Sequence, residues 1–258
     1  MSETSSSQLV KSADRTLRLL EHLAAKQHSL SLHTLHMELG IPKSSLHGLL
    51  RTLRERGWVE TDNSGKLFRL GARALLVGIS YVDADEVVAA SREVLDELGE
   101  ETGETIHLAR LDAARPQAEV VYLATRQSKH HLRLYSRIGR RLPAHTTALG
   151  KALLAHRSQA DLKELLSPPL QALTEHTITD VDALQGDLAA TLARGYALDW
   201  EENTIGIGCV GCALLAKNPP QHALSISVPL ARLDEERVEE LARLLQDTVE
   251  RLQSRLFR

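Results

Sequence analysis

The sequence predicts an α+β protein of two domains, and three observations lead to that prediction. At 258 residues, with 43% hydrophobic and 25% charged residues, the chain is long for one small domain and can bury a sizeable core. Its first 70 residues contain two short helical patterns followed by two short strands. Farther along, strand-like alternation is flanked by helical patterns at both ends. We therefore expect a small helical domain followed by a larger α+β domain.

The segment 29–60 reads as two short helices joined by a tight turn. Gly40 permits the turn, and Pro42 suits the first turn of the second helix, where its missing N–H is not needed. The second helix carries leucines at the i, i+3, i+4, i+7 spacing of a buried stripe, namely Leu46, Leu49, Leu50 and Leu53. A further helix over residues 9–25 is expected to pack beneath this pair.

The outer face of the second helix is polar and basic, which suits a helix that enters a DNA major groove. We expect DNA contacts from this face and from the hairpin behind it, by Lys43, Ser44, Ser45, His47, Arg51 and Lys66. That hairpin covers residues 58–70, as two strands around a DNSG turn. A solvated surface helix is the alternative, but the tight turn, the proline and the hairpin favour a winged helix-turn-helix over residues 9–70.

The charge distribution supports the same division. Residues 1–76 hold 11 Lys and Arg against 7 Asp and Glu, a net charge of +4, whereas the remainder holds 20 against 27, a net charge of −7. A mildly basic head on an acidic body is typical of a nucleic-acid-binding module joined to a domain that does not bind nucleic acid.

The other elements follow from hydrophobic periodicity. The polar, Ser-rich residues 1–8 are expected to form a disordered tail, and the apolar, proline-free stretch 71–84 reads as a linker helix. Within the second domain, residues 85–258, helices are predicted over 85–102, 147–156, 159–166, 180–193 and 233–257. Strands are predicted over 105–111, 119–125, 131–136, 196–200, 206–216 and 223–229.

Blocks of the sequence carry a family resemblance. They are the run LSLHTLHMELGIPKSSLHGLLRTLRERGWVE with the FRLG behind it, RLPAHTTALGKALLA, GYALDWEENTIGIGCVGCALL and ALSISVPLARL. In these blocks and their order, the chain resembles the isocitrate lyase regulator (IclR) family of bacterial transcription factors, from about residue 9 to about residue 252. Gly48 and Ala213 depart from the family, which frequently has arginine and proline at those positions.

The resemblance implies both a fold and a function. The fold is a winged helix-turn-helix joined by the linker helix to a GAF-like effector-binding domain with a curved antiparallel sheet. The function is ligand-responsive transcriptional regulation, more often repression, on a palindromic operator, with a small carboxylate or sugar acid as effector. The family implies a homodimer through the DNA-binding domains and often a tetramer through the effector domains. We expect double-stranded DNA and a small molecule as partners, and no cofactor.

The same resemblance implies an effector pocket. Residue by residue, Asp199, Cys209, Ser225 and Ser227 match positions that line the family's pocket. The two serines are two apart on a predicted strand and therefore face the same side. Two buried hydroxyls on an apolar strand call for a hydrogen-bonding partner, such as a ligand or a water. Asp199 suits recognition of a hydroxyl, and its charge can also exclude an over-charged ligand.

The start of the helix predicted at residue 147 adds a second part of that pocket. Thr146 and Thr147 can cap this helix, and its free amides near Ala148 and Leu149 can hold a carboxylate. Leu149 is larger than the small residue often found in the family, which predicts a partly filled pocket. His107 is expected in the pocket as well, with a satisfied core histidine as the equal alternative.

Two rival functions are weaker. Cys209 and Cys212 form a lone C-x-x-C, but residues three apart on a strand face opposite ways and cannot share a metal, so we expect no metal site. An enzyme acting on a small acid is the other rival, but no base is placed beside a nucleophile, and we expect no catalytic residue. The sequence shows no long apolar run and no basic leader, so cytoplasmic residence without membrane contact is the default expectation.

Overall fold

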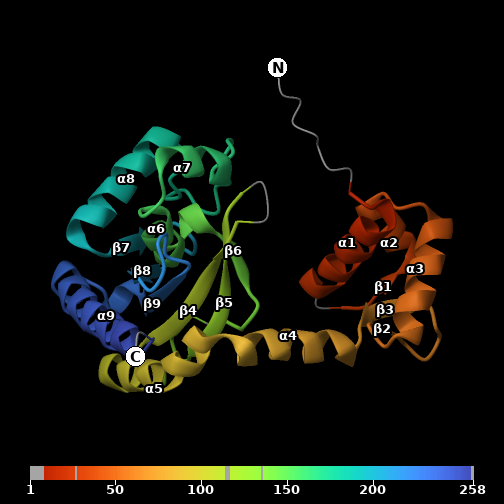
Figure 1. The fold of residues 1–258 in the computed structure, drawn as a ribbon, viewed down its shortest axis with the longest axis horizontal. Coiled ribbons are helices and arrows are strands. Elements are labelled where there is room, and N and C mark those ends of the chain that lie inside the picture. Colours follow the sequence, from red (N-terminus) through yellow and green to blue (C-terminus); the bar gives the residue numbers. More distant parts are fainter. Residues whose placement is uncertain (1–8, 27, 114–116, 135, 257–258) are drawn as a thin grey trace. The chain divides into compact units, whose positions relative to one another are not determined.

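The computed structural model describes residues 9–26, 28–113, 117–134 and 136–256. The chain divides into two compact units, Met1–Val82 and Asp83–Arg258, and each is described by itself (Figure 1). The tail predicted over residues 1–8 lies outside the described residues. Of the helices described, none combines the length and the apolarity that crossing a membrane requires.

The first unit is a winged helix-turn-helix. Its helices are α1 (Lys11–Ala25), α2 (Leu32–Leu39) and α3 (Lys43–Glu55). Its antiparallel sheet has the order β1-β3-β2, from β1 (Leu30–Ser31), β2 (Val59–Thr61) and β3 (Leu67–Leu70). The helices and the sheet enclose one apolar core, formed by Leu19, Leu23, Leu30, Leu35, Ile41, Leu46, Leu50, Leu53 and Val59. The predicted leucine stripe is therefore buried, except that Leu49 packs at its margin.

Local hydrogen bonds set the ends of these elements. Ser31 caps α2 by accepting a hydrogen bond from the amide of Thr34 at 3.1 Å. Gly40 ends α2 in the left-handed region, with φ of 65°, which glycine adopts without steric cost. In the wing turn, the Asp62 carboxylate accepts hydrogen bonds from the amides of Lys66 and Leu67, both at 3.0 Å. These contacts fix the hairpin that follows α3.

A helix crosses from the first unit to the second. This helix, α4 (Ala72–Ala84), contains no buried residue. Apolar side chains stand exposed along it, at Leu75, Leu76, Val77 and Ile79. At its end Asp85 caps the next helix, α5 (Glu86–Thr102), by accepting hydrogen bonds from the first amides of that helix.

The second unit is built on a curved antiparallel sheet, which the described residues form with the strand order β6-β5-β4-β9-β8-β7. The strands are β4 (Thr105–Asp112), β5 (Glu119–Arg126), β6 (Arg141–Pro143), β7 (Ala197–Trp200), β8 (Ile207–Leu214) and β9 (His222–Pro229). Short 3-10 turns, η1 (Ala144–Thr146) and η2 (Leu230–Arg232), follow β6 and β9. The central strand β9 is buried along its whole length, as expected for a strand covered on both faces.

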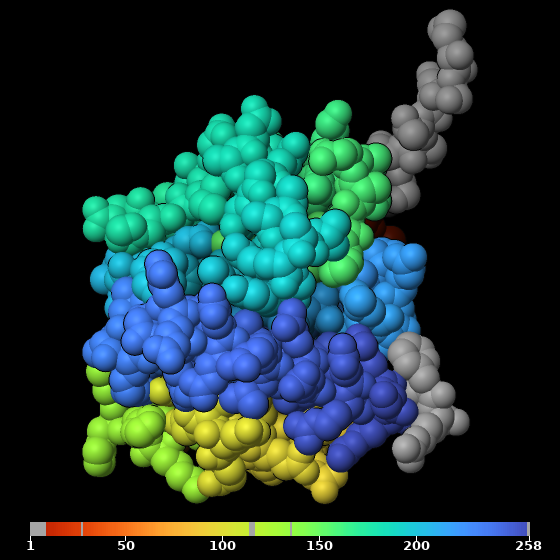
Figure 2. All heavy atoms as spheres, turned by 90° about the vertical axis from the view of Figure 1, so that its left-hand side faces the viewer, coloured from red at the N-terminus to blue at the C-terminus, as the bar shows by residue number. Residues whose placement is uncertain are grey.

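Helices cover both faces of this sheet (Figure 1). On one side lie α6 (Ala148–Leu154), α7 (Gln159–Leu165) and α8 (Val181–Arg194). On the other side α5 packs against the C-terminal helix α9 (Glu235–Leu256). Figure 2 shows α9 between α8 and α5 on one face of the unit, where Arg251 and Arg255 of α9 pair with Glu97 and Glu93 of α5.

One predicted strand is wrong. Of the segment 131–136, the described residues form bends and an irregular chain, and β5 pairs instead with β6 at Arg141–Pro143. Alternation suggested a strand, but Leu132 is 62% exposed, and the segment is held by irregular contacts rather than by a ladder. The side chains of Arg232 and Gln127 donate to the carbonyls of Leu132 and Ser136. A strand pattern without a partner strand does not make a strand.

Candidate nucleic-acid interface and small-molecule pocket

The outer face of α3 and the wing enclose a groove of about 530 Å³. Ser44, His47, Gly48 and Arg51 line it from α3, together with Arg54 and, from the wing, Gly65. Lys43 and Lys66 are exposed and are next in sequence to the lining residues Ser44 and Gly65, but they do not line the groove themselves. Ser45 is half-buried and accepts a hydrogen bond from Arg15 of α1 at 3.3 Å. Of the α3 residues expected at DNA, Ser44, His47 and Arg51 are therefore brought together.

Cations at this groove differ from other cations of the same unit. Away from the groove, Arg18 lies 3.8 Å from Asp14, Lys26 lies 3.1 Å from Glu38 and Arg69 lies 3.1 Å from Glu60. Within the described residues, Lys43, Arg51, Arg54 and Lys66 form no such ion pair. Phosphate contacts dominate the affinity of proteins for DNA, and a cation without a carboxylate partner is free to make them.

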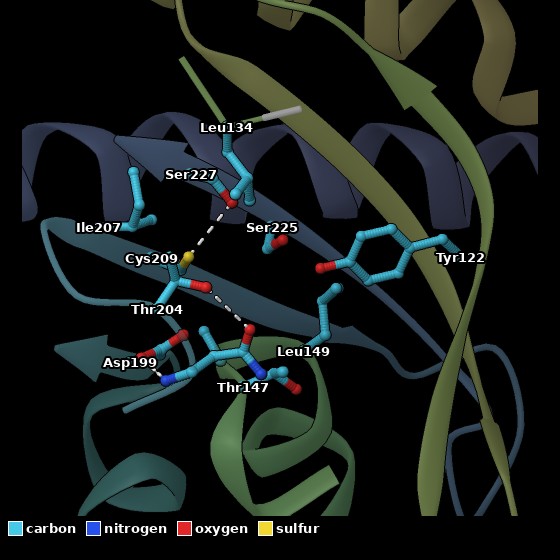
Figure 3. Close-up of a pocket in the computed structure, with 12 residues that line it drawn as sticks. Tyr122, Leu134, Thr147, Leu149, Asp199, Thr204, Ile207, Cys209, Ser225 and Ser227 are labelled. Carbon is cyan, nitrogen blue, oxygen red and sulfur yellow. Dashed lines mark hydrogen bonds between the residues drawn. The ribbon is translucent and has the colours of Figure 1, made fainter. Parts of the chain in front are cut away.

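The second candidate site is a small cavity between the sheet and α6. The strand register places Asp199 of β7 beside Cys209 of β8, and Cys209 beside Ser227 of β9. Ser225 follows on the same face of β9, and Figure 3 shows these side chains pointing toward one cavity. The further lining residues are Tyr122, Leu134, Thr147, Ala148, Leu149, Asn203, Thr204 and Ile207. Segments from four strands, one helix and two loops therefore meet here.

The cavity is small, and the first turn of α6 lies close to the sheet there. Its volume is about 10 Å³, room for about one water molecule. Leu149 and Tyr122, only 2% and 4% exposed, fill much of the remaining space (Figure 3). Thr147 caps α6 by accepting the amide of Gly150 at 3.0 Å. A methyl group on Gly211 of β8 would lie 2.7 Å from the Ala148 carbonyl, so glycine is what lets α6 approach β8.

Asp199 is the ionisable group at the centre of the pocket. It is 3% exposed, and its Oδ1 accepts hydrogen bonds from the amides of Glu202 at 2.8 Å and Asn203 at 3.4 Å. Burial, and next the charge of Glu202, raise the pKa of Asp199 to about 7. The carboxyl group is therefore poised between its protonated and ionised forms near neutral pH.

The two cysteines have separate environments. The Cys209 thiol lies 3.2 Å from the Ser227 hydroxyl inside the pocket, whereas Cys212 contacts the Gly195 carbonyl on the opposite face of the strand. Burial, and for Cys209 also the nearby Asp199, raise the pKa of both thiols, that of Cys212 to about 12. A neutral thiol is a poor nucleophile and a poor metal ligand. Among the described residues, no cluster of His, Cys, Asp and Glu suits a metal ion.

A buried ion cluster beneath the pocket was not foreseen from the sequence. Lys151 of α6 is 1% exposed, and its Nζ lies 2.5 Å from Glu202 and 2.9 Å from Asp187 of α8. Arg194 lies 3.7 Å from Asp187 on the same helix. The second carboxyl oxygen of Glu202 is buried without a hydrogen bond. A signal existed in the sequence, since Lys151 interrupts an apolar helix, but lysine is usually exposed.

His107 does not line the cavity, contrary to expectation. It is fully buried on β4, where its ring stacks on Tyr122 at a centroid separation of 4.6 Å. Its Nδ1 lies 3.2 Å from the Thr125 hydroxyl and 3.3 Å from that of Ser136. Burial, and next the charge of Arg140, lower the pKa of His107 to about 3, so the ring is neutral. Tyr122 occupies the place at the cavity, and its hydroxyl points inward (Figure 3).

Comparison with known proteins gives the same result for both units. Residues 12–63 match the IclR helix-turn-helix domain, and residues 79–254 match the domain described as bacterial transcriptional regulator IclR C-terminal. The chain is 34% identical over 238 residues to the transcriptional repressor IclR of Escherichia coli K12, covering 92% of this chain and 86% of that protein.

Solved structures are similar along almost the whole chain. The IclR of Thermotoga maritima has a TM-score of 0.71 and 26% identity, covering 96% of this chain and 99% of that one. An IclR homologue from Microbacterium hydrocarbonoxydans, crystallised with 4-hydroxybenzoate, has a TM-score of 0.78 at 21% identity, covering 95% and 98%. At that identity the second likeness concerns the fold alone.

Proposed function

The chain belongs to the IclR family of bacterial transcriptional regulators, and from that membership we propose that it is a ligand-responsive repressor. Its relatives are repressors rather than enzymes, so DNA binding and not catalysis is its activity. In the proposal residues 9–70 bind an operator, residues 71–84 link the domains and residues 85–258 bind an effector. The effector is a small carboxylic acid.

The groove between α3 and the wing supports operator binding. Within the described residues its lining cations, Arg51 and Arg54, form no ion pair with a carboxylate. Ser44, His47 and Arg51 stand together where a helix presents side chains to base edges. Lys43 and Lys66 flank them as phosphate contacts, with Ser45 as a support for Arg15. The exposed apolar residues of α4 support assembly of a homodimer, which would present two copies of α3 to a palindromic operator. Tetramers would form through the second unit.

The pocket lining supports a small acid as effector. The single observation that carries this proposal is the row Asp199, Cys209 and Ser227, with Ser225 beside it, facing the capped start of α6. Buried hydroxyls require hydrogen-bonding partners, and a carboxylate or hydroxyl of a ligand supplies them. The cavity of about 10 Å³ holds only about one water molecule, so an acid enters only if lining side chains such as Leu149 and Tyr122 move, and a small acid requires less movement than a sugar acid.

The proposal is tested by separating the two sites. Arg51→Ala is expected to weaken operator binding in a mobility shift while the calorimetric affinity for an acid stays unchanged. Ser225→Ala is expected to do the reverse. The acids to compare are acetate, glycolate, pyruvate, gluconate and 4-hydroxybenzoate. If none of these binds the wild-type protein, or if Ser225→Ala binds the same acid equally well, the pocket assignment fails.

A further inference from the structure

We propose that Asp199 binds the effector in its protonated form and donates a hydrogen bond to the ligand carboxylate, so that each binding event takes up a proton. This inference rests on the proposed function, in which the pocket takes a small carboxylic acid. The proton taken up on binding would come from solvent and would stay on the Asp199 carboxyl group, which would donate it in a hydrogen bond to the ligand without transferring it. The pocket would then sense acid concentration and pH together.

The contacts of Asp199 leave a carboxyl group facing the cavity without a cation. The backbone amides of Glu202 and Asn203 occupy Oδ1, and the Cys209 thiol faces the same carboxyl group. The nearest ammonium, that of Lys151, is held by Glu202 at 2.5 Å and by Asp187 at 2.9 Å. Within the described residues, no cation lies in contact with Asp199. An ionised Asp199 would therefore be a buried charge without an ion-pair partner.

Among the described residues, the charged and titratable groups that act on Asp199 come from several elements packed around it. Glu202 contributes a negative charge from the loop after β7, and Lys151 a positive charge from α6, which Asp187 of α8 also shares. From β8 the Cys209 thiol and from β5 the Tyr122 phenol face the site, and burial raises the pKa of both, so both are neutral. In these surroundings Lys151 pairs with Glu202 and Asp187, and Arg194 also pairs with Asp187, so each cation of the cluster already has a carboxylate partner before Asp199 is counted.

A ligand carboxylate adds one more negative charge to this cluster. Two carboxyl groups that share a small, buried site cannot both remain ionised without a large cost, and one of them takes a proton. The ligand carboxylate would accept hydrogen bonds from the hydroxyls of Ser225 and Ser227, which favour its ionised form. Asp199, in contrast, is buried near the negative charge of Glu202, and both of these favour its protonated form. The proton therefore resides on Asp199. Its raised pKa, about 7, agrees with this assignment.

The pH dependence follows directly. In the free protein the protonated fraction of Asp199 is near one at pH 6 and falls about tenfold for each pH unit above 7. Affinity for an acid that needs the protonated form therefore falls as pH rises. His107 does not produce the same trend, because burial lowers its pKa to about 3 and the ring stays neutral across this range. Burial also lowers the pKa of His145.

The test is calorimetric titration of the full-length protein with pyruvate, which is an anion throughout, between pH 6 and pH 8. We expect affinity to fall about tenfold over this range. In buffers of different ionisation enthalpy, proton uptake should rise toward one per pyruvate as the pH increases. Asp199→Asn should bind pyruvate with no pH dependence and no proton uptake, because an amide donates at every pH. Thermal unfolding confirms that the variant is folded.

The control ligand is pyruvamide, which has the size of pyruvate without its charge. Because pyruvamide adds no negative charge, its affinity should not show the fall with pH that pyruvate shows. Pyruvate affinity that instead rises with pH would mean that Asp199 is ionised in the complex, and that result overturns the proposal. Pyruvate binding with constant affinity and no proton uptake overturns it as well, while leaving the proposed function intact. If the wild-type protein binds none of the acids at pH 6, the proposed function itself fails.

Discussion

On α3, Arg51 and Arg54 stand exposed and form no ion pair with a carboxylate of the described residues, whereas beneath the α6 pocket Lys151 is buried in contact with two carboxylates. Arg51 and Arg54 in the first site face a groove open to solvent. In the second, Lys151 is 1% exposed and Asp199 beside it is 3% exposed. The same kinds of side chain therefore occupy opposite environments within one chain.

On the exposed face of α3, side chains can affect DNA binding without affecting folding stability. In the buried pocket, the same side chains affect both ligand binding and folding stability. An exposed cation contributes little to folding, so the DNA-reading face can change without unfolding the protein. A buried charge contributes strongly when paired and destabilises the fold when its partner is lost. In the proposed function, ligand recognition at Asp199 is consequently tied to folding stability and to pH, whereas DNA recognition is tied to salt.

The largest expected effect comes from the buried lysine. Lys151→Met keeps the side-chain length but leaves the buried Glu202 without its cation and Asp187 with Arg194 alone. We expect a loss of about 3 to 5 kcal/mol in the free energy of unfolding, measured by denaturant titration. Lys26→Met is the matched control, because the Lys26 to Glu38 pair is exposed, and it should cost less than about 1 kcal/mol. Equal losses in the two variants would remove the contrast between the sites.

The next effect is the pH dependence that Asp199 gives to stability. Its pKa is about 7 in the folded chain against 3.8 ordinarily, so the native state holds the proton more tightly than the unfolded chain. Stability is therefore lost as pH rises from about 4 through about 7. Asp199→Asn removes this loss, and we expect it to be more stable than wild type by about 2 to 4 kcal/mol at pH 8.

Denaturant titrations at several pH values check this expectation. The advantage of Asp199→Asn should shrink steadily between pH 7 and pH 4, as the wild-type carboxyl group becomes protonated. A difference that stays constant with pH would show that the asparagine acts by packing and not by charge. Ser227→Ala is the control, because it changes a neighbouring lining residue without changing charge and keeps Asp199. The difference in unfolding free energy between this variant and the wild type should not change with pH.

A smaller effect is expected at the DNA-reading face. Arg51→Ala should weaken operator binding by about 1 to 3 kcal/mol, which is roughly fivefold to 150-fold, without changing the unfolding free energy. Fluorescence anisotropy with a labelled operator, selected from random DNA by the wild-type protein, measures this change. Lys26→Met should bind the operator as the wild type does, since Glu38 already engages that ammonium. A comparable loss in Lys26→Met would argue against a localised reading face.

The smallest effect concerns Gly48. A methyl group there would meet nothing within 4 Å, so Gly48→Ala adds no clash and reduces the backbone freedom of the unfolded chain. We expect about 0.5 to 1 kcal/mol of added stability and an unchanged operator affinity. Loss of operator binding in this variant would instead mean that DNA approaches the α3 backbone closely at this position.

Much of the fold could be predicted because local patterns determine it. The leucine stripe of α3, the Gly40 turn and the helices predicted over 85–102 and 180–193 follow from short-range rules, and the structure confirms these elements. The segment 131–136 could not be predicted in the same way. Alternation alone does not supply a partner strand, and here β6 takes the edge of the sheet.

The candidate site was harder to predict because distant segments form it. The period of two on β9 correctly placed Ser225 and Ser227 on one face, and the structure brings them to Asp199 and Cys209. Tyr122 was missed, since which residue of a buried strand reaches a cavity depends on the packing of neighbouring strands. The burial of Lys151 was missed for the same reason.

The central claim made for this protein is that an acid in the Asp199 pocket changes how the first unit binds DNA. The most direct measurement is the operator dissociation constant of the full-length protein at pH 6, by fluorescence anisotropy, with and without saturating pyruvate or whichever acid binds. We predict a change of at least about fivefold in the wild-type protein and none in Ser225→Ala. An acid that binds the wild-type pocket by calorimetry, yet leaves its operator affinity unchanged, would contradict the claim.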